Sequence, residues 1–131
     1  MATITEDYVS FETAKLLKEK RFDGECSIYY DVEDRELDEP NRHELAYDYN
    51  NIYIKAPTLQ MAMKWLREKH KLFIQVNIVP HTTITMEQKY YLFSIHKDRR
   101  RLHRDDVPIN YYNTYEEACE AAIKYCLKNL I

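Results

Sequence analysis

A single glycine, Gly24, is the feature that most limits what this 131-residue chain can fold into. Phosphate-binding loops of the P-loop and Rossmann types need several glycines, because the backbone must approach the phosphate without side chains in the way. The same count excludes the Gly-x-Ser-x-Gly nucleophile elbow and the glycine-containing motif of RRM-type RNA binders. The glycine count therefore removes several large classes of nucleotide-, ester- and RNA-handling proteins.

Length and composition are those of one folded domain. A chain of 131 residues predicts a single domain over residues 1–131. Apolar residues make up 45% and charged residues 31%, which is typical of globular proteins. The polar N-terminus predicts no signal peptide, and no apolar run approaches the roughly 20 residues that span a bilayer. We therefore expect a cytoplasmic protein that does not contact membranes.

Charge is unevenly distributed along the chain. Residues 1–50 carry six Lys/Arg and fourteen Asp/Glu, a net charge of −8, whereas residues 51–131 carry a net charge of +5. An acidic stretch from Glu33 to Glu44 accounts for much of the first value. This distribution predicts a dipolar surface, unless folding brings the two regions together.

Capping residues mark three helices. Ser10 and Thr58 are good N-caps, and Thr114 with Glu117 forms a capping box. The Asp23-Gly24 pair is expected to end the first helix, because glycine adopts the left-handed cap conformation at little cost. The predicted helices therefore follow Ser10, run from Thr58 to about His70, and run from Tyr115 to Asn129.

Alternating apolar residues indicate four strands, within residues 26–32, 45–54, 72–78 and 90–96. Residues 33–44 and 97–110 are expected to be mostly loop. The resulting order, α-β-β-α-β-β-α, predicts an α+β fold with one four-stranded, mainly antiparallel sheet and helices packed on one face. Ser10 and Thr58 each open a helix followed by two strands, which raises the hypothesis of a duplicated α-β-β unit.

Tyrosine is the most over-represented residue, with twelve copies. If helices cover only one sheet face, the pleat predicts that the other face carries Tyr29, Phe73, Gln75, Asn77, Tyr90, Leu92 and His96. Aromatic rings of this kind suit a protein partner, a second copy of the chain or a nucleobase. The alternative interpretation is that tyrosines simply occupy strand positions, where they are favoured.

A basic run over residues 97–104 contains Arg99, Arg100, Arg101 and Arg104. Arginine forks match phosphates and carboxylates, so the run predicts a partner that bears such groups. A solvated loop, or one paired with the acidic stretch, is the alternative. Nucleic-acid binding through this run is a further hypothesis, although a sequence pI of about 6.0 argues against it.

Catalytic patterns are incomplete. His81-Thr82-Thr83 matches half of a two-histidine phosphoesterase motif, and no second half exists in the sequence. No regular His/Cys spacing predicts a metal site, and we expect no cofactor. Cys119 and Cys126 are predicted to be buried core thiols. An enzyme that pairs His81 or His96 with a carboxylate stays open as an alternative.

Three stretches, ITEDYVSFETAKLLKEK, APTLQMAMKWLREKH and NTYEEACEAAIKYCLKNLI, resemble a family of small, uncharacterised phage and prophage proteins of Bacteroides and its relatives. The resemblance implies a protein made in the cytoplasm of an infected or lysogenic bacterium, and it assigns no catalytic or binding residue. The leading hypothesis is a non-enzymatic binding protein, expected to form homo-oligomers. Its partner would be a host protein that it blocks, or a nucleotide-derived immune signal that it sequesters.

Overall fold

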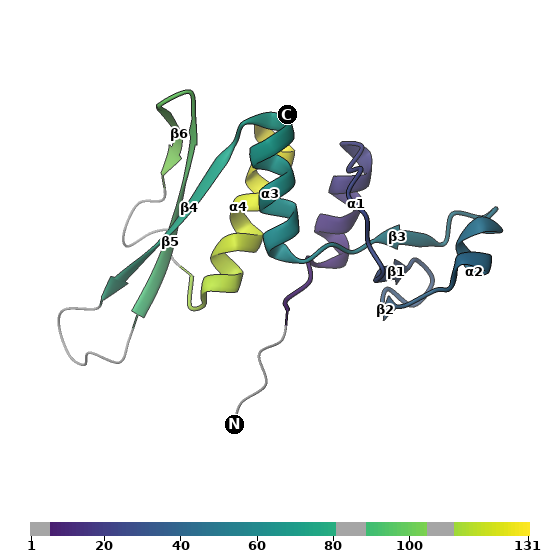
Figure 1. Ribbon diagram of the computed structural model, residues 1–131. Helices are drawn as coiled ribbons and strands as arrows, with labels where there is room; N and C mark the ends of the chain where they lie inside the picture. Colours follow the sequence, from purple (N-terminus) through teal and green to yellow (C-terminus); the bar gives the residue numbers. More distant parts are fainter. Residues whose placement is uncertain (1–5, 81–88, 105–111) are drawn as a thin grey trace. The chain divides into compact units, whose positions relative to one another are not determined.

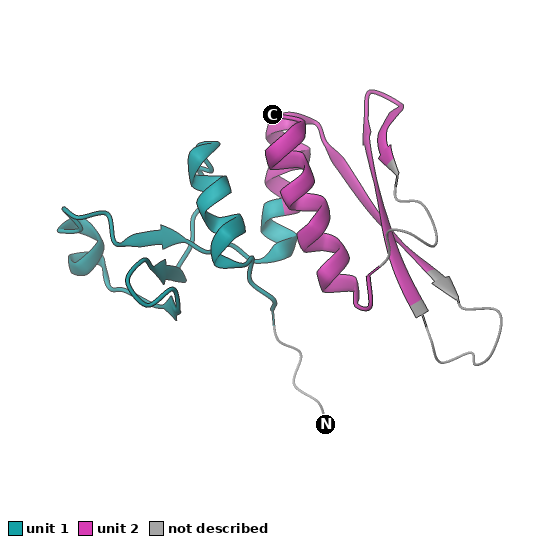
Figure 2. Cartoon of the chain, turned by 180° about the vertical axis from the view of Figure 1, so that it is seen from behind, with its two compact units in different colours: residues 1–62 teal, residues 63–131 magenta. Residues whose placement is uncertain are grey.

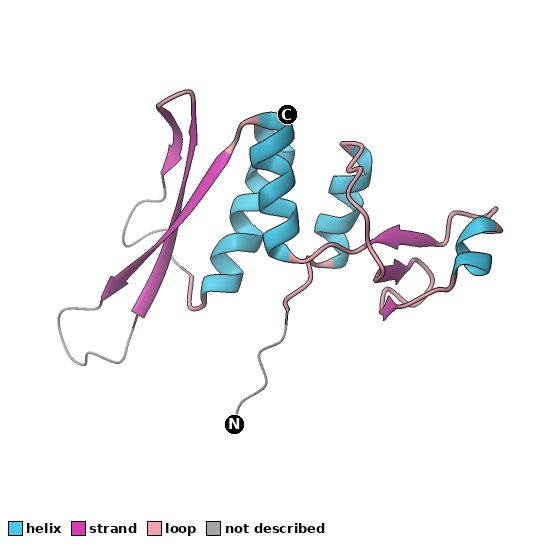
Figure 3. Ribbon diagram, viewed as in Figure 1, coloured by secondary structure: helices cyan, strands magenta, loops and turns pink. Residues whose placement is uncertain are grey.

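The computed structural model describes residues 6–80, 89–104 and 112–131, and Figure 1 shows its helices and strands. The chain divides into two compact units, residues 1–62 and 63–131 (Figure 2). Each unit combines helix with its own three-stranded antiparallel sheet (Figure 3). The predicted α+β class and the antiparallel pairing are confirmed, and the single domain stays a prediction.

The first unit packs short strands against a helix. Its sheet has the order β2-β1-β3, and Tyr30 of β1 lies opposite Ile54 of β3. Both residues are buried, as is Leu17 of α1, and the Tyr30 hydroxyl donates a hydrogen bond to the Val9 carbonyl over 2.6 Å. The elements of this unit are α1 (Phe11–Glu19), β1 (Tyr29–Asp31), β2 (Leu37–Asp38), α2 (Arg42–Ala46) and β3 (Tyr53–Lys55).

The second unit is a longer antiparallel sheet with α4 against one of its faces. The strand order is β4-β5-β6, and α4 contacts β4 and β5. Small and aliphatic residues of α4, among them Ala122 and Ile123, are fully buried. The remaining elements are α3 (Leu59–His70), which begins at the end of the first unit, β4 (Phe73–Pro80), β5 (Lys89–Lys97), β6 (Arg100–Arg104) and α4 (Tyr115–Asn129).

All three predicted N-caps are confirmed. The Ser10 hydroxyl accepts a hydrogen bond from the amide of Thr13 over 3.2 Å. The Thr58 hydroxyl accepts one from the Met61 amide, and the Thr114 hydroxyl accepts one from the amide three residues later, each over 3.1 Å. These bonds satisfy amides that have no partner inside their helices, so the caps fix where each helix begins.

The predicted end of the first helix at Asp23-Gly24 is wrong, because α1 ends three residues earlier. Arg21, with φ 63°, takes the left-handed position instead of Gly24. The amide of Phe22 donates to the Leu17 carbonyl over 2.9 Å, and the Arg21 amide donates to the Lys18 carbonyl over 3.0 Å. This pair of bonds is a Schellman motif, and the two residues that usually make its apolar contact, here Leu17 and Phe22, are both buried.

The predicted single four-stranded sheet is also wrong, since the described residues form two three-stranded sheets instead. Residues 45–49, read as a strand from their alternation, contribute instead to the end of α2 and a turn. Asn41 starts that helix with a capping box, because its side chain accepts from the Glu44 amide while Glu44 accepts from the Asn41 amide. Tyr47 and Tyr49 are consequently exposed rather than buried on a sheet face.

Candidate functional site

The register of the second sheet brings most of the predicted tyrosine-face residues onto one face. Residues directly opposite each other in an antiparallel pair project from the same face. Phe73 lies opposite His96, Gln75 opposite Ser94, and Asn77 opposite Leu92. On the far side of β5, Arg101 of β6 lies opposite His96. We define the outer face as Phe73, Gln75, Asn77, Tyr90, Leu92, Ser94, His96 and Arg101.

The two faces of this sheet differ in what covers them. Phe93 and Ile95 project from the α4 side and are 3% and 0% exposed. Phe73 projects from the outer face, and its ring is 48% exposed. In the described ranges no helix lies over the outer face, as Figure 1 shows for β4, β5 and β6. The outer face is therefore a solvent-facing surface that retains large apolar and aromatic groups.

A tight turn connects this face to the arginine cluster. Residues 100–104 form strand β6, so the predicted loop is wrong at these positions. Asp98 and Arg99 form the two-residue connection, with φ 51° and 65°. Positive φ at both central positions is typical of a type I′ hairpin turn, which matches the twist of the strands. The basic run is thereby held on a hairpin, with Lys97, Arg99, Arg100 and Arg101 exposed.

The eight predicted binding residues divide into three groups. Those on the outer face, by pairing register, are Tyr90, Leu92, His96 and Arg101. Arg104 pairs with Ser94 through the backbone and, like Arg99 and Arg100, belongs to the basic hairpin. Arg99 lies in the turn. Arg100 pairs with Lys97 and is the neighbour of Arg101 in β6, so by the alternation of a strand it does not share the outer face. A register irregularity between Ile95 and His96 accompanies the start of this basic end. Tyr29 belongs to β1 of the other sheet, so its predicted place on the shared face is wrong.

His96 has a polar neighbour on its own strand. Its Nε2 lies 3.1 Å from the hydroxyl of Ser94, which is 7% exposed. The two side chains are two positions apart and therefore share the outer face. The recorded partner of His96 is thus a hydroxyl rather than a carboxylate. His81, the other histidine of the enzyme hypothesis, lies outside the described residues.

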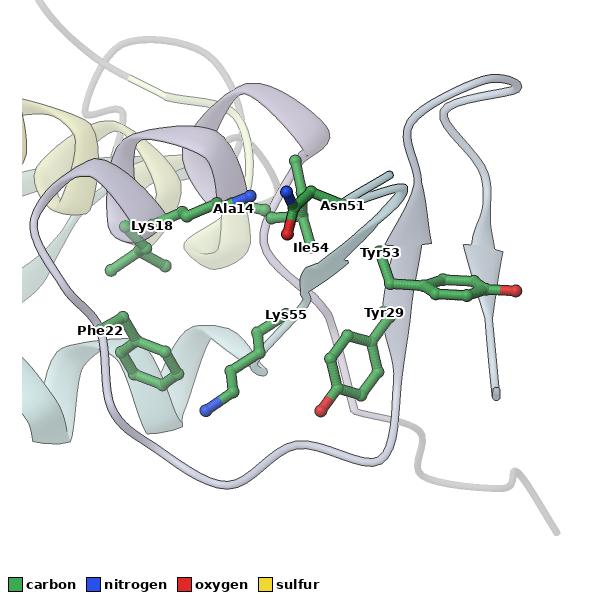
Figure 4. A pocket seen from close by; sticks show the side chains of 9 residues that line it. Ala14, Lys18, Phe22, Tyr29, Asn51, Tyr53, Ile54 and Lys55 are labelled. Atoms are coloured by element: carbon green, nitrogen blue, oxygen red, sulfur yellow. The ribbon is translucent and has the colours of Figure 1, made fainter. Parts of the chain in front are cut away.

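Tyr29 instead lines a pocket in the first unit. The pocket has a volume of about 250 Å³ and lies between α1 and the β1–β3 pair. Figure 4 shows the rings of Phe22 and Tyr29 with the Lys55 ammonium between them. The ring of Tyr53 meets that of Tyr29 edge-on, with 6.5 Å between centroids. The residues that line the pocket are Ala14, Leu17, Lys18, Phe22, Tyr29, Asn51, Tyr53, Ile54 and Lys55.

The polar groups around this pocket are held by specific partners. The Lys55 ammonium donates a hydrogen bond to the Gly24 carbonyl over 2.8 Å. The Tyr53 hydroxyl donates to Glu44 over 3.1 Å, and loss of hydration followed by that carboxylate raises the pKa of Tyr53. Burial, reinforced by Cys26, raises the pKa of Tyr29. Both phenols therefore stay protonated near neutral pH, and the Tyr53 hydroxyl acts as a hydrogen-bond donor to Glu44.

Sequence reasoning missed this pocket. Lys18 and Phe22 lie at the end of α1, whereas Lys55 comes from β3, far along the chain from both. No spacing rule links them, because their proximity depends on how α1 packs against β3. Only the atypical tyrosine count pointed to Tyr29, and it placed that ring on the wrong surface.

The predicted buried thiols of α4 are confirmed. Cys119 and Cys126 are fully buried, and burial raises their pKa values to about 11 and about 12. A thiol at such a pKa is almost entirely protonated at neutral pH and is a poor nucleophile. Cys26 is only half-buried, and burial raises its pKa against the opposing effect of Lys55. These cysteines act as small packing residues.

Comparisons with protein-family models, curated proteins and solved structures gave no match to this chain. The resemblance to phage proteins accordingly stays a prediction. Within the described residues, no helix has the length and apolarity needed to traverse a bilayer. Among those same residues, no three His, Cys, Asp or Glu side chains gather in a way that would hold a metal ion.

Proposed function

We propose that this chain is a non-enzymatic binding protein that holds an acidic surface of a bacterial host protein against its outer face and thereby blocks that protein. The resemblance to small phage proteins supplies the cellular setting of the proposal. The observation that carries it is the outer face itself, where a half-exposed Phe73 lies opposite His96 and His96 lies opposite Arg101.

The mixture of groups on this face is that of an interaction surface. Aromatic side chains and arginine dominate the energetics of many protein interfaces, because they bury large areas and make directional hydrogen bonds. Phe73, Tyr90 and Leu92 supply ring and aliphatic area, and Arg101 supplies a guanidinium at the edge. A pleated face held between backbone hydrogen bonds loses little conformational entropy on binding, which favours affinity.

The charge expected of the partner's surface follows from the charges on the hairpin between β5 and β6. Lys97, Arg99, Arg100 and Arg101 are all exposed within five residues, and Asp98 is the single carboxylate among them. A cationic edge beside an apolar centre favours a partner whose apolar patch is bordered by Asp or Glu. Each carboxylate on the partner can accept two parallel hydrogen bonds from one arginine guanidinium.

Affinity capture with matched variants tests this proposal. The wild-type chain is immobilised and exposed to nuclease-treated lysate of a Bacteroides strain. Phe73→Ser combined with Arg101→Ser removes one ring and one guanidinium from the outer face. Tyr49→Ser combined with Arg42→Ser makes the same chemical changes at exposed positions of the first unit. Any captured protein is then titrated against each purified variant by calorimetry.

We expect the outer-face variant to bind the captured protein at least about 100-fold more weakly. This factor corresponds to about 2.7 kcal/mol of binding free energy, which is less than two interface anchors of about 2 kcal/mol each would supply. The Tyr49/Arg42 control should keep wild-type affinity. Equal binding by both variants, or capture that occurs only from a parallel lysate without nuclease treatment, would contradict the proposal. The second result would favour nucleic-acid binding through residues 97–104.

The pocket of the first unit favours a second function, capture of a small nucleotide-like anion. Phe22 and Tyr29 offer ring faces, Lys18 and Lys55 offer ammonium groups, and among the residues that the structure describes no carboxylate side chain lines the pocket. A volume of about 250 Å³ is at the small end for ligand pockets and suits one ring and one phosphate. This function predicts calorimetric binding of AMP or ADP-ribose that Lys18→Met combined with Lys55→Met abolishes. No heat with either nucleotide at about 100 μM protein would refute it.

A further inference from the structure

The two edges of the second sheet differ sharply in charge. The β6 edge carries Arg100, Arg101 and Arg104, and arginines of this kind protect an edge strand from pairing with other chains. The β4 edge runs from Phe73 to Val79 as Phe-Ile-Gln-Val-Asn-Ile-Val, without a single charged residue. Within the described ranges, β4 pairs with β5 alone, so its other side is an unpaired edge.

Strand β4 also exposes apolar side chains on both faces of the sheet. Phe73 is 48% exposed on the outer face, and Ile78 is 56% exposed on the face that carries α4. The strands of the first sheet are only two or three residues long, whereas β4 has eight. A long, uncharged edge with exposed apolar groups is the type of strand that pairs with another chain.

We propose that β4 pairs antiparallel with β4 of a second copy, about a twofold axis at Val76, and joins the two sheets into one. The sequence of β4 is self-complementary in this register. Ile74 lies opposite Ile78 of the second copy, and Gln75 lies opposite Asn77 of the second copy. Val76 lies opposite its own counterpart on the axis.

The register satisfies both the side chains and the backbone. Paired positions differ by an even number of residues, so partners project from the same face, and successive pairs alternate between hydrogen-bonded and non-hydrogen-bonded positions, as in any antiparallel ladder. The exposed Ile78 is then covered by Ile74 of the second copy on the α4 side. On the outer side, the Gln75 amide meets the Asn77 amide, and each has a donor and an acceptor for the other. Twofold symmetry makes each contact twice, as expected for a closed dimer.

This inference is independent of the proposed host partner, because it concerns the edge of the sheet rather than its outer surface. Its readout is the mass of the protein in solution, whereas the host-binding proposal is read by capture. The two proposals can therefore fail separately.

A charge-swap pair of variants tests the register, with sedimentation velocity of the full chain from about 1 to 300 μM as the measurement. Gln75→Lys combined with Asn77→Lys places lysines opposite lysines across the axis, twice per dimer. Gln75→Lys combined with Asn77→Glu places each lysine opposite a glutamate. Both variants alter the same exposed positions, so each is a matched control for the other.

We expect a wild-type dimer, a rise in the dimer dissociation constant of at least about 100-fold in the lysine–lysine variant, and recovery of the dimer in the lysine–glutamate variant. Far-UV circular dichroism confirms that each variant is folded. A wild-type monomer throughout the concentration range would overturn the proposal, as would a dimer that persists with four lysines at its axis. Failure of the lysine–glutamate variant to dimerise would overturn the register.

Discussion

Substitution of the one glycine tests the packing at the end of α1. A Cβ at position 24 would lie 2.4 Å from Cζ of Phe22, and 3.0 and 3.1 Å from its two Cε atoms. Ordinary carbon contacts are about 3.5–4.0 Å, so the ring would have to move by about 1 Å. Phe22 is 9% exposed and is one of the two residues that usually make the apolar contact of a Schellman motif, so the movement disturbs a packed site.

Overpacking of this size costs about 1–3 kcal/mol, and the lower entropy of the unfolded alanine chain returns about 0.4–1 kcal/mol. We therefore expect Gly24→Ala to lower the free energy of unfolding by about 1–2 kcal/mol, measured by urea denaturation. The same substitution in a Phe22→Leu background should cost less than about 0.5 kcal/mol, because leucine lacks the ring atoms that clash. An equal cost in both backgrounds would refute the reasoning, since the clash would then lie elsewhere.

Two further predictions concern the same helix end and the buried thiols. Arg21→Gly should raise the free energy of unfolding by about 0.5–1 kcal/mol, because it relieves a left-handed backbone at φ 63°; an unchanged or lower urea midpoint would contradict this. Cys119 and Cys126 hold their protons in the folded state up to pH values of about 11 and about 12, whereas unfolded thiols ionise near 9.0. The folded chain therefore binds more protons above pH 9, so stability should fall as pH rises from 9 to 12. In Cys119→Ala combined with Cys126→Ala that part of the slope should disappear, and a slope identical to wild type would exclude the thiols as its source.

Local signals predicted the helices well and the sheets poorly. The caps at Ser10, Thr58 and Thr114 depend on hydrogen bonds within three or four residues, so sequence alone identified them. The end of α1 was missed because an arginine, rather than the nearby glycine, takes the left-handed position. The chain uses a non-glycine residue at every described left-handed site, which removes the usual sequence signal for turns.

The sheets required information that the sequence pattern does not contain. Alternation in the segment 72–78 correctly gave the face of Phe73, Gln75 and Asn77, because the period of a strand is a local property. Alternation in residues 45–49 gave a false strand, since the capping box at Asn41 favours a short helix there. The turn at Asp98-Arg99 lacks the glycine that commonly marks type I′ hairpins, so the sequence predicts a loop where β6 forms.

The sequence predicts the part of the candidate site that lies on one strand, but not the parts that depend on strand pairing. Tyr90, Leu92 and His96 share a face because they alternate along one strand, and β6 adds Arg101 through a pairing that no local pattern indicates. The prediction that Tyr29 shares this face depends on a single sheet, which the described residues do not form. With two sheets, the ring of Tyr29 lines the Lys55 pocket of the first unit, whereas the outer face belongs to the second sheet and carries Tyr90.

Hydrogen–deuterium exchange of the chain, with and without its captured protein partner, tests the outer face most directly. The account predicts slower exchange in β4, β5 and β6 on binding, with α1 and β3 unchanged. Protection confined to α1, β1 and β3 would contradict it and would instead assign binding to the Lys55 pocket.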